Sequence, residues 1–362
     1  MKELNDIVQA YDIAVLQNKK TALVTVVQVI GSSYRRPGAR MLVTEDGAIT
    51  GAISGGCLEG DALRKAQLAI FRQQNRLEIY DTTSEEDQNL GIQLGCNGIV
   101  YILFEPIRAD DPDNPIHLLK KVVRERKNAV LATIFQAEKK AEQPGTRYLI
   151  YADDLAKLPD NTLKADVPEV FRQQASVVKS YAEYSISYQF VPPVIQLIVI
   201  GAGNDVQPLL EMAALLGWLM VIADGRPGYA TQARFPKAHQ VLVTKPGEPL
   251  EGITLDERSA VLLMTHNYPH DLAALAWWIQ TDCPYIGILG PRKKLTKMLE
   301  ELQERGIDTS GKTQLYGPIG LDIGAETSEE IALSIIAEIK AVFSGRAGMS
   351  LRDRTVEIHE RG

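Results

Sequence analysis

A cysteine, three glycines and two acids lie together in SGGCLEGD, residues 54–61. Gly55 and Gly56 precede Cys57, and apolar residues at helical spacing follow it, so Cys57 is expected where a turn becomes a helix. The helix dipole favours a thiolate there, which predicts a reactive or ligating sulfur. The alternative is a buried cysteine that acts as a small hydrophobe. Glu59, in the first helical turn, either complements the helix dipole, orients a nearby arginine or accepts a proton.

Arginines crowd a second stretch, GSSYRRPGARMLV, residues 31–43. The guanidinium fork matches the oxygens of a phosphate or a carboxylate, and a glycine turn offers backbone N–H groups to the same anion. The Asp46-Gly47 pair predicts a short hairpin, which would bring this loop to the SGGCLEGD turn. We therefore expect one anion pocket built from both stretches. Its candidate residues are Ser32, Ser33, Arg35, Arg36, Arg40, Gly55 and Gly56.

Glycines also follow a strongly apolar run in VIGAGNDV, residues 199–206. Gly201 and Gly203 stand between an expected strand and an expected helix, where a tight turn can receive a pyrophosphate. Val206 occupies the third small position of the dinucleotide fingerprint, which is therefore incomplete. Asp224 ends the next strand, where an acid can accept ribose hydroxyls and would favour NAD over NADP. The alternative is that any such turn in an α/β sheet uses glycine.

Further candidates follow other strands of the same half. Arg226 lies just after Asp224 in ADGRP, and His266 and Asn267 lie in MTHNYPHD. Arg292 is the second residue of PRKK, which follows the strand YIGILG. Ligands in open α/β sheets bind at the carboxyl ends of strands, so these residues are candidates for cofactor or anion binding. The alternatives are helix capping near His270 and a solvated helix start at Arg292.

Two domains are expected to position these residues, divided as 1–190 and 191–362. The boundary falls where Pro192 and Pro193 precede a new apolar run. The first half mixes strands and helices without regular βαβ order, which indicates an N-terminal α+β domain. The second half alternates short apolar strands with helices, including a last helix with a capping box at Thr327 and Glu330. This order predicts an α/β chain whose C-terminal domain is a Rossmann-like, doubly wound parallel sheet.

Composition limits the function classes. The 362 residues are 45% hydrophobic and 23% charged, with a net charge of −7, which disfavours nucleic acid as a partner. No apolar run reaches the length of a membrane helix and no export signal is visible, so a cytoplasmic protein is expected. Cys57, Cys96 and Cys283 form no CxxC pair, which argues against a disulfide framework. Cys96, in GIQLGCNG, is either a second sulfur facing the Cys57 cavity or part of a glycine turn.

Eight motifs in collinear order make the whole chain resemble the XdhC/CoxI family of xanthine dehydrogenase accessory proteins. They are GSSYRRPGARMLV, GAISGGCLEGD, LGCNG, VIGAGN, ADGRP, MTHNYPHD, YIGILG and IGLDIGAETSEEIALSI. The sequence departs from the family pattern at Tyr34, Asn97, Asn204 and Tyr268. Because Asn204 and Tyr268 stand where the family carries histidine, a metal or acid–base role in the second half is weakened.

The resemblance implies a chaperone that binds molybdenum cofactor (molybdopterin). Such a protein would protect the cofactor during sulfuration by a cysteine desulfurase and help insert it into a molybdenum hydroxylase apo-enzyme. The arginine loop would then hold the pterin phosphate, and Cys57 would lie near the dithiolene or the molybdenum. A homodimer is a further expectation. On this hypothesis the protein is a carrier more than a turnover enzyme.

Three alternatives remain from the sequence. The first is an NAD(P)-dependent oxidoreductase, or a protein that binds another nucleotide, through the Rossmann-like half. The second is a sulfur-transfer enzyme in which Cys57 is the nucleophile or carries a persulfide. The third is a structural partner protein in which these sites have lost their function.

Overall fold

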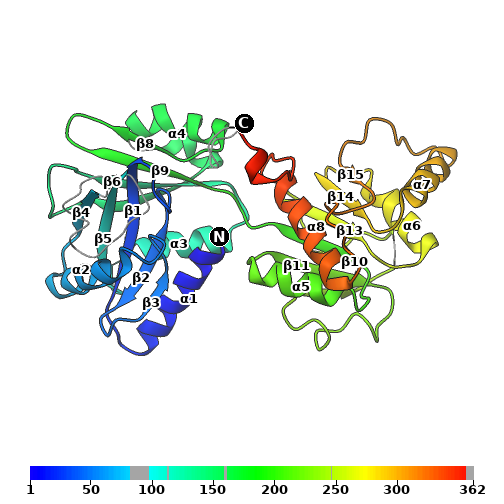
Figure 1. Ribbon diagram of the computed structural model, residues 1–362, viewed down its shortest axis with the longest axis horizontal. Helices are drawn as coiled ribbons and strands as arrows, with labels where there is room; N and C mark the ends of the chain where they lie inside the picture. The colour runs from blue at the N-terminus through cyan, green and yellow to red at the C-terminus, as the bar shows by residue number, and fades with distance from the viewer. Residues whose placement is uncertain (82–97, 112–113, 159–160, 246, 356–362) are drawn as a thin grey trace. The chain divides into compact units, whose positions relative to one another are not determined.

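A computed structural model describes residues 1–81, 98–111, 114–158, 161–245 and 247–355 of the chain (Figure 1). The chain divides into two compact units, Met1–Pro193 and Val194–Gly362, next to the boundary expected between residues 190 and 191. Cys96 and Asn97 lie outside the described residues. The first unit contains two sheets and the second unit one, and each unit has its own apolar cores.

The first unit begins with a five-stranded sheet of order β3-β2-β1-β5-β4. Its strands are β1 (Thr21–Gly31), β2 (Arg40–Thr44), β3 (Ile49–Gly51), β4 (Arg76–Asp81) and β5 (Gly98–Ile107). Helix α2 (Glu59–Arg72) covers one face through small residues such as Ala62, Ala66 and Ala69. Strand β3 is short, because the chain turns away after Gly51 to reach α2.

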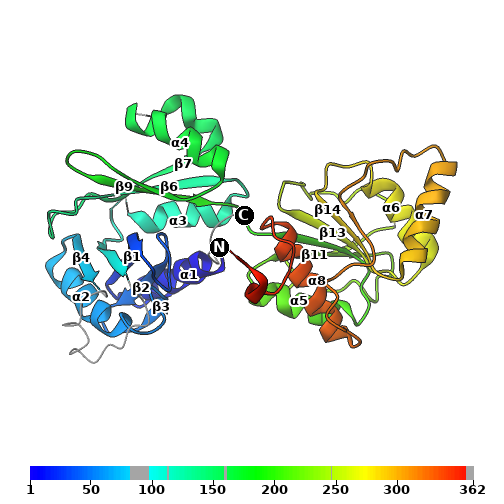
Figure 2. The same cartoon turned by 45° about the horizontal axis from the view of Figure 1, so that its top comes forward.

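A second sheet completes the first unit, with order β7-β6-β9-β8. Its strands are β6 (Ala129–Phe135), β7 (Gly145–Tyr151), β8 (Val177–Ser180) and β9 (Ser185–Val191). Helices α1 (Lys2–Leu16) and α3 (Pro115–Arg124) share one apolar core with residues of both sheets, and Figure 2 shows α3 between them. The short helix η2 (Ala152–Lys157) and helix α4 (Asn161–Gln173) lead into β8, and α4 packs on the other face of the second sheet.

The second unit is a parallel sheet of order β12-β11-β10-β13-β14-β15. Its strands are β10 (Gln196–Ile200), β11 (Leu219–Asp224), β12 (Gln240–Val243), β13 (Ser259–Leu263), β14 (Tyr285–Ile288) and β15 (Leu315–Tyr316). In chain order this is 3-2-1-4-5-6, the arrangement of a Rossmann fold. The predicted Rossmann-like, doubly wound sheet is therefore confirmed.

Helices cover both faces of this sheet (Figure 2). They are α5 (Val206–Leu215) and α8 (Ser328–Val342) on one face, and α6 (Tyr268–Trp278) and α7 (Arg292–Glu304) on the other; a short helix η3 (Leu351–Asp353) follows α8. The predicted capping box of α8 is present, because the Thr327 side chain accepts from the Glu330 backbone and the Glu330 carboxylate accepts from the Thr327 backbone. Among the residues that the structure describes, no helix has the length and apolar character needed to cross a membrane.

Candidate functional sites in the two units

Cys57 lies in an exposed turn immediately before α2. The helix begins at Glu59 and Leu58 is its N-cap, so the cysteine stands just outside the helix. Its thiol is free and exposed, so the alternative of a buried, inert cysteine is wrong. Gly56 has a φ of +111°, and among the described residues, its two chain neighbours apart, no atom lies within 4 Å of the place where its Cβ would be. The turn therefore presents a sulfur on open surface beside a position that has no side chain.

Glu59 holds this turn in place. Its carboxylate accepts hydrogen bonds from the backbone N–H of Ser54 (2.8 Å), the backbone N–H of Ile53 (3.2 Å) and the Ser54 hydroxyl. The Ser54 oxygen in turn accepts from the backbone N–H groups of Gly56 and Leu58. Partial burial by itself would raise the pKa of the Glu59 carboxyl, but the hydrogen bonds from Ser54 and Ile53 outweigh it and the pKa is lowered. Glu59 is thus a positioning residue for the turn that carries Cys57.

Arg35, in the loop before β2, forms an ion pair with Glu3 of α1. Glu3 is therefore its partner in place of the suggested Glu59. Arg36, in the same loop, is exposed, whereas Arg35 is half-buried.

Arg40 is buried, and its predicted role as an anion ligand is wrong. The residue is 1% exposed, and its guanidinium donates to the backbone oxygen of Gly38 (3.1 Å) and to the side-chain oxygen of Gln189 in β9. Burial lowers the pKa of Arg40 to about 10, although the carboxylates of Glu105 and Glu3 act against that shift. Arg40 links the two sheets of the first unit and cannot reach a bound anion.

The remaining part of the loop lies against the Cys57 turn. The ring of Tyr34, itself exposed, would be 3.4 Å from a Cβ at Gly55, so loop and turn are in contact, as expected. Ser32 is exposed and Ser33 is half-buried. Gly98, the first described residue after Cys96, is packed so closely that a Cβ would come within 2.5 Å of the Ser32 backbone oxygen. The structure thus joins the arginine loop, the glycine turn and the start of β5 at one surface.

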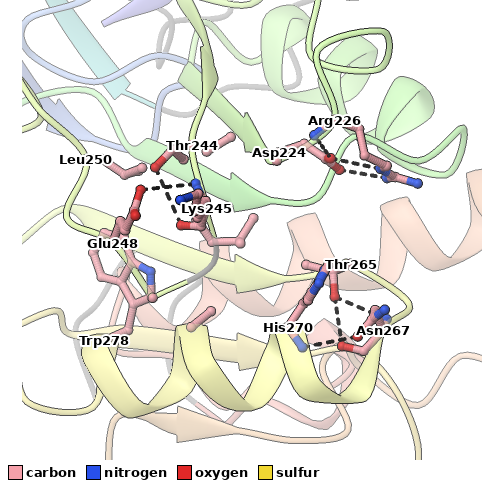
Figure 3. A pocket seen from close by; sticks show the side chains of 15 residues that line it. Asp224, Arg226, Thr244, Lys245, Glu248, Leu250, Thr265, Asn267, His270 and Trp278 are labelled. Carbon is pink, nitrogen blue, oxygen red and sulfur yellow. Dashed lines mark hydrogen bonds and ion pairs between the residues drawn. The ribbon is translucent and has the colours of Figure 1, made fainter.

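The second unit has a pocket where β10, β11, β12 and β13 end (Figure 3). Asp224, Arg226 and Asn267, three of the predicted candidates, line it. Its volume is about 100 Å³, below the roughly 300 to 1,000 Å³ of whole-ligand pockets, so it suits one ring or one sugar of a larger ligand. The pocket is at the carboxyl edge of the sheet, where ligands of open α/β folds bind.

Several lining residues were not among the candidates. They are Thr244, Lys245, Glu248, Thr265, His270 and Trp278. Thr244 and Lys245 directly follow β12 and Thr265 follows β13 closely, so their place at the carboxyl end of an apolar run was the available signal. Trp278, the last residue of α6, is buried and reaches the pocket from a helix. No local sequence pattern marks a helix residue of that kind.

Asp224 is not free to accept ribose hydroxyls, contrary to the expectation. The residue is 7% exposed. One carboxylate oxygen accepts from the backbone N–H of Ala202 (2.8 Å) and from Nη2 of Arg226 (2.7 Å), and the other accepts from the backbone N–H and Nε of Arg226 (both 2.9 Å). Desolvation would raise the pKa of Asp224, but these hydrogen bonds, first those of Arg226, lower it. Asp224 therefore connects the loop after β10 to the loop after β11.

The glycine loop after β10 is fixed by close contacts. Gly201 has a φ of +126°, and a Cβ there would collide with the backbone oxygen of Met264. A Cβ at Gly203 would collide with the Asp205 side chain. Asn204 accepts a hydrogen bond from Nη2 of Arg234 at 2.9 Å. The two glycines thus allow close packing within the fold, which is sufficient to explain them without a ligand.

His266 and Arg292 do not line the pocket. His266 has a φ of +55°, and its Nε2 lies 2.7 Å from a carboxylate oxygen of Asp205. Helix capping near His270 was expected, and the capping residue is Asn267, whose side chain accepts from the backbone N–H of His270 at the start of α6. Arg292 is exposed at the first position of α7. Within the described ranges no group of three histidine, cysteine or acidic side chains could hold a metal ion.

These features define a class: a two-unit α/β protein with an exposed cysteine turn in the first unit and a Rossmann domain in the second. The family model described as "XdhC Rossmann domain" matches residues 197–339, and the model described as "XdhC and CoxI family" matches residues 14–81. A Bacillus subtilis protein described as a probable xanthine dehydrogenase subunit is 32% identical over 332 residues, covering 90% of this chain and 94% of that protein. The chain belongs to the XdhC and CoxI family.

Two further similarities extend over nearly the whole chain. The molybdenum cofactor insertion chaperone PaoD of Escherichia coli is 25% identical over 329 residues, covering 91% of this chain and 85% of that protein. A crystal structure described as a xanthine dehydrogenase from Bacillus halodurans superimposes with a TM-score of 0.73 at 28% identity, covering 96% of this chain and 98% of the other. Both relations include the two units together.

Proposed function

We propose that this protein binds molybdenum cofactor and helps to insert it into a molybdenum hydroxylase of the xanthine dehydrogenase type. The similarity to a molybdenum cofactor insertion chaperone along 91% of the chain carries the proposal. The Cys57 turn adds local support, because an exposed thiol in a glycine turn suits a soft metal or a sulfur-rich ligand.

The first unit has residues that fit such a cofactor. Cys57 would lie next to the molybdenum or its dithiolene, Gly56 would allow the ligand to approach the backbone, and Arg36 would face the phosphate. Tyr34, beside Gly55, offers an exposed ring on which a flat pterin can stack. Arg40 contributes nothing to the ligand because it is buried. The bound cofactor supplies the redox chemistry of the hydroxylase, while this chain binds and shields it.

Partners follow from the same proposal. The apo-form of a molybdenum hydroxylase would receive the cofactor, and a cysteine desulfurase would supply sulfur while the cofactor is held. A homodimer is proposed on the family resemblance alone, and its test is the molecular mass in solution. A cytoplasmic location is part of the proposal, because a free thiol such as that of Cys57 stays reduced in that compartment.

The experiment is co-purification. The protein is mixed with released molybdenum cofactor, isolated by size exclusion and oxidised, and the fluorescent pterin is quantified. Wild type is expected to retain about one pterin per chain, and Cys57→Ala and Arg36→Ala are expected to lose most of it. Cys283→Ala removes a buried thiol of the second unit, and Arg172→Ala removes an exposed arginine of α4, so both serve as matched controls.

Pterin on wild type no higher than on an unrelated protein would refute the carrier function. Full retention by both Cys57→Ala and Arg36→Ala would refute the proposed site while leaving the carrier function in place. The sulfur-transfer alternative is separated in the same preparation: after incubation with a cysteine desulfurase and cysteine, a persulfide on Cys57 in the absence of any pterin would favour that alternative.

A further inference from the structure

Arg226 is held in a fixed orientation at the rim of the second unit's pocket. Its guanidinium donates through Nε and Nη2 to the two oxygens of Asp224 and lies over the ring of Tyr229, 4.0 Å from the ring centre. The side chain is nevertheless 50% exposed. Two contacts thus fix the plane of the fork, while much of its surface still faces solvent.

The guanidinium of Arg226 has N–H donors that the ion pair with Asp224 does not use. A guanidinium carries five N–H donors, and the ion pair with Asp224 engages only Nε and Nη2. In the part of the chain that the structure describes, Nη1 of Arg226 has no hydrogen-bond partner. A planar cation with an open edge and a fixed position is the arrangement that binds phosphate oxygens best.

Asp224 stands where a Rossmann fold places the acceptor of the ribose hydroxyls. Its two oxygens already accept four hydrogen bonds, from Ala202 and Arg226, so a ribose hydroxyl finds no vacant acceptor there. Releasing the carboxylate would leave a buried charge without its partner, which is strongly unfavourable. The acid is therefore closed to a ribose hydroxyl, while the cation on its outer side is half-exposed.

Further cations accompany Arg226. The guanidinium of Arg234 lies 4.9 Å from the centre of the same Tyr229 ring and donates to the backbone oxygen of Ala202. Lys245 lines the pocket with its side chain exposed. Glu248 is the opposing charge at the pocket, because Asp224 is neutralised by Arg226. Figure 3 shows the Asp224 and Arg226 pair on one side of the pocket and Lys245 on another.

We infer that this pocket binds a nucleotide that carries a phosphate on the 2′- or 3′-oxygen of its ribose, and that Arg226 recognises that phosphate. The base would lie against the apolar wall formed by Ile200, Leu250, Ala274 and Trp278. This reverses the preference for NAD that Asp224 suggested from the sequence. The inference concerns a free nucleotide in the second unit, so its outcome does not depend on pterin binding to the first.

The test is calorimetric titration of the full chain with adenosine 2′,5′-bisphosphate, adenosine 3′,5′-bisphosphate and adenosine 5′-monophosphate. At least one bisphosphate is expected to bind about tenfold more tightly than the monophosphate, or better, since a hydrogen-bonded charge pair contributes about that much. The bisphosphate that binds more tightly identifies the source, a 2′-phosphate as in NADP or a 3′-phosphate as in coenzyme A.

Arg226→Ala is expected to reduce the bisphosphate affinity to that of the monophosphate. Arg226→Lys can keep the ion pair with Asp224 but loses the planar fork, so the preference should fall several-fold. Arg305→Ala, which removes an exposed arginine at the end of α7, is the matched control and should change nothing. If Arg226→Ala fails to fold, Arg226→Lys decides the question.

Three outcomes would overturn the inference. One is a monophosphate affinity equal to or higher than that of both bisphosphates. A second is a phosphate preference that survives unchanged in folded Arg226→Ala or in Arg226→Lys. The third is no binding of any of the three nucleotides at millimolar concentration.

Discussion

The cysteine turn of the first unit and the glycine loop of the second use similar residues to different ends. In the turn, Ser54 and Glu59 make the internal hydrogen bonds and leave Cys57 exposed. In the loop after β10, Asp224 and Arg234 bond to the loop itself, and Gly201 packs against Met264. Residue type and position are therefore not enough to identify a site. A residue can bind a ligand only if its polar atoms are not already engaged in hydrogen bonds within the fold.

The largest expected effect concerns Arg40, which looks like a member of the arginine loop and behaves as part of the core. Arg40→Met should lower the free energy of unfolding by about 2 to 4 kcal/mol, because the buried oxygens of Gly38 and Gln189 lose their charged donor and the buried Glu105 loses one of two nearby cations. Urea denaturation would measure this, with the exposed Arg172→Met as control. If Arg40→Met kept wild-type stability but lost pterin, Arg40 would belong to the site after all.

A smaller effect is expected at Glu59. A substitution there tests whether this residue positions the turn or takes part in chemistry. Glu59→Gln should cost about 1 kcal/mol at neutral pH, since an amide nitrogen replaces one acceptor oxygen. The pKa of Glu59 is lowered from its ordinary value of 4.5, so the ionised carboxylate stabilises the folded chain fully above about pH 4.5. That contribution is lost as the pH falls through the lower pKa of the folded state.

Thermal unfolding of wild type and Glu59→Gln between pH 3 and pH 7 would reveal this pH dependence. The two proteins should converge in stability at the acid end. A difference that stayed constant over the whole range would contradict the assignment of Glu59 as an ionised positioning residue. Cys57→Ala is a suitable control, because it alters the exposed end of the same turn and leaves the carboxylate in place.

The smallest effect is expected at His266, which lies beside the pocket without lining it. His266→Gly removes an exposed pair with Asp205 but also relieves a left-handed backbone at φ +55°, so stability should change by less than about 1 kcal/mol. Asp205→Asn weakens the same pair without altering that backbone, which separates the two effects in thermal unfolding. Loss of nucleotide binding in His266→Gly would show that this residue belongs to the pocket.

The Rossmann half was predictable because its strands are short runs buried on both faces, as in IQLIVIG and SAVLLMT, and each is bounded by glycine or a helix pattern. The second sheet of the first unit was harder. Its strand β7 reads GTRYLIY and β9 reads SISYQFV, with polar and aromatic residues mixed, and α4 contains Pro168. Those patterns do not separate strand from loop until the partner strands are known.

The candidate site could be predicted only in part. The contact between Tyr34 and Gly55 follows from a short hairpin, which local sequence encodes. The burial of Arg40 does not, because its acceptor Gln189 lies 149 positions away in another sheet. Likewise, Asp224 had the right place for a ribose acceptor, and only the geometry of Arg226 and Ala202 reveals that its oxygens are occupied.

The bond between Arg40 and Gln189 also has a consequence for synthesis of the chain. On the ribosome, Arg40 emerges long before β9 has been translated. Until then the guanidinium lacks its Gln189 acceptor and must be hydrated by water. The first unit therefore completes its core only when β9 has emerged, as the second unit begins to follow at β10. A nascent chain that stops before β9 would lack the acceptor of this arginine, so we expect it to leave the core of the first unit open to folding chaperones and proteases.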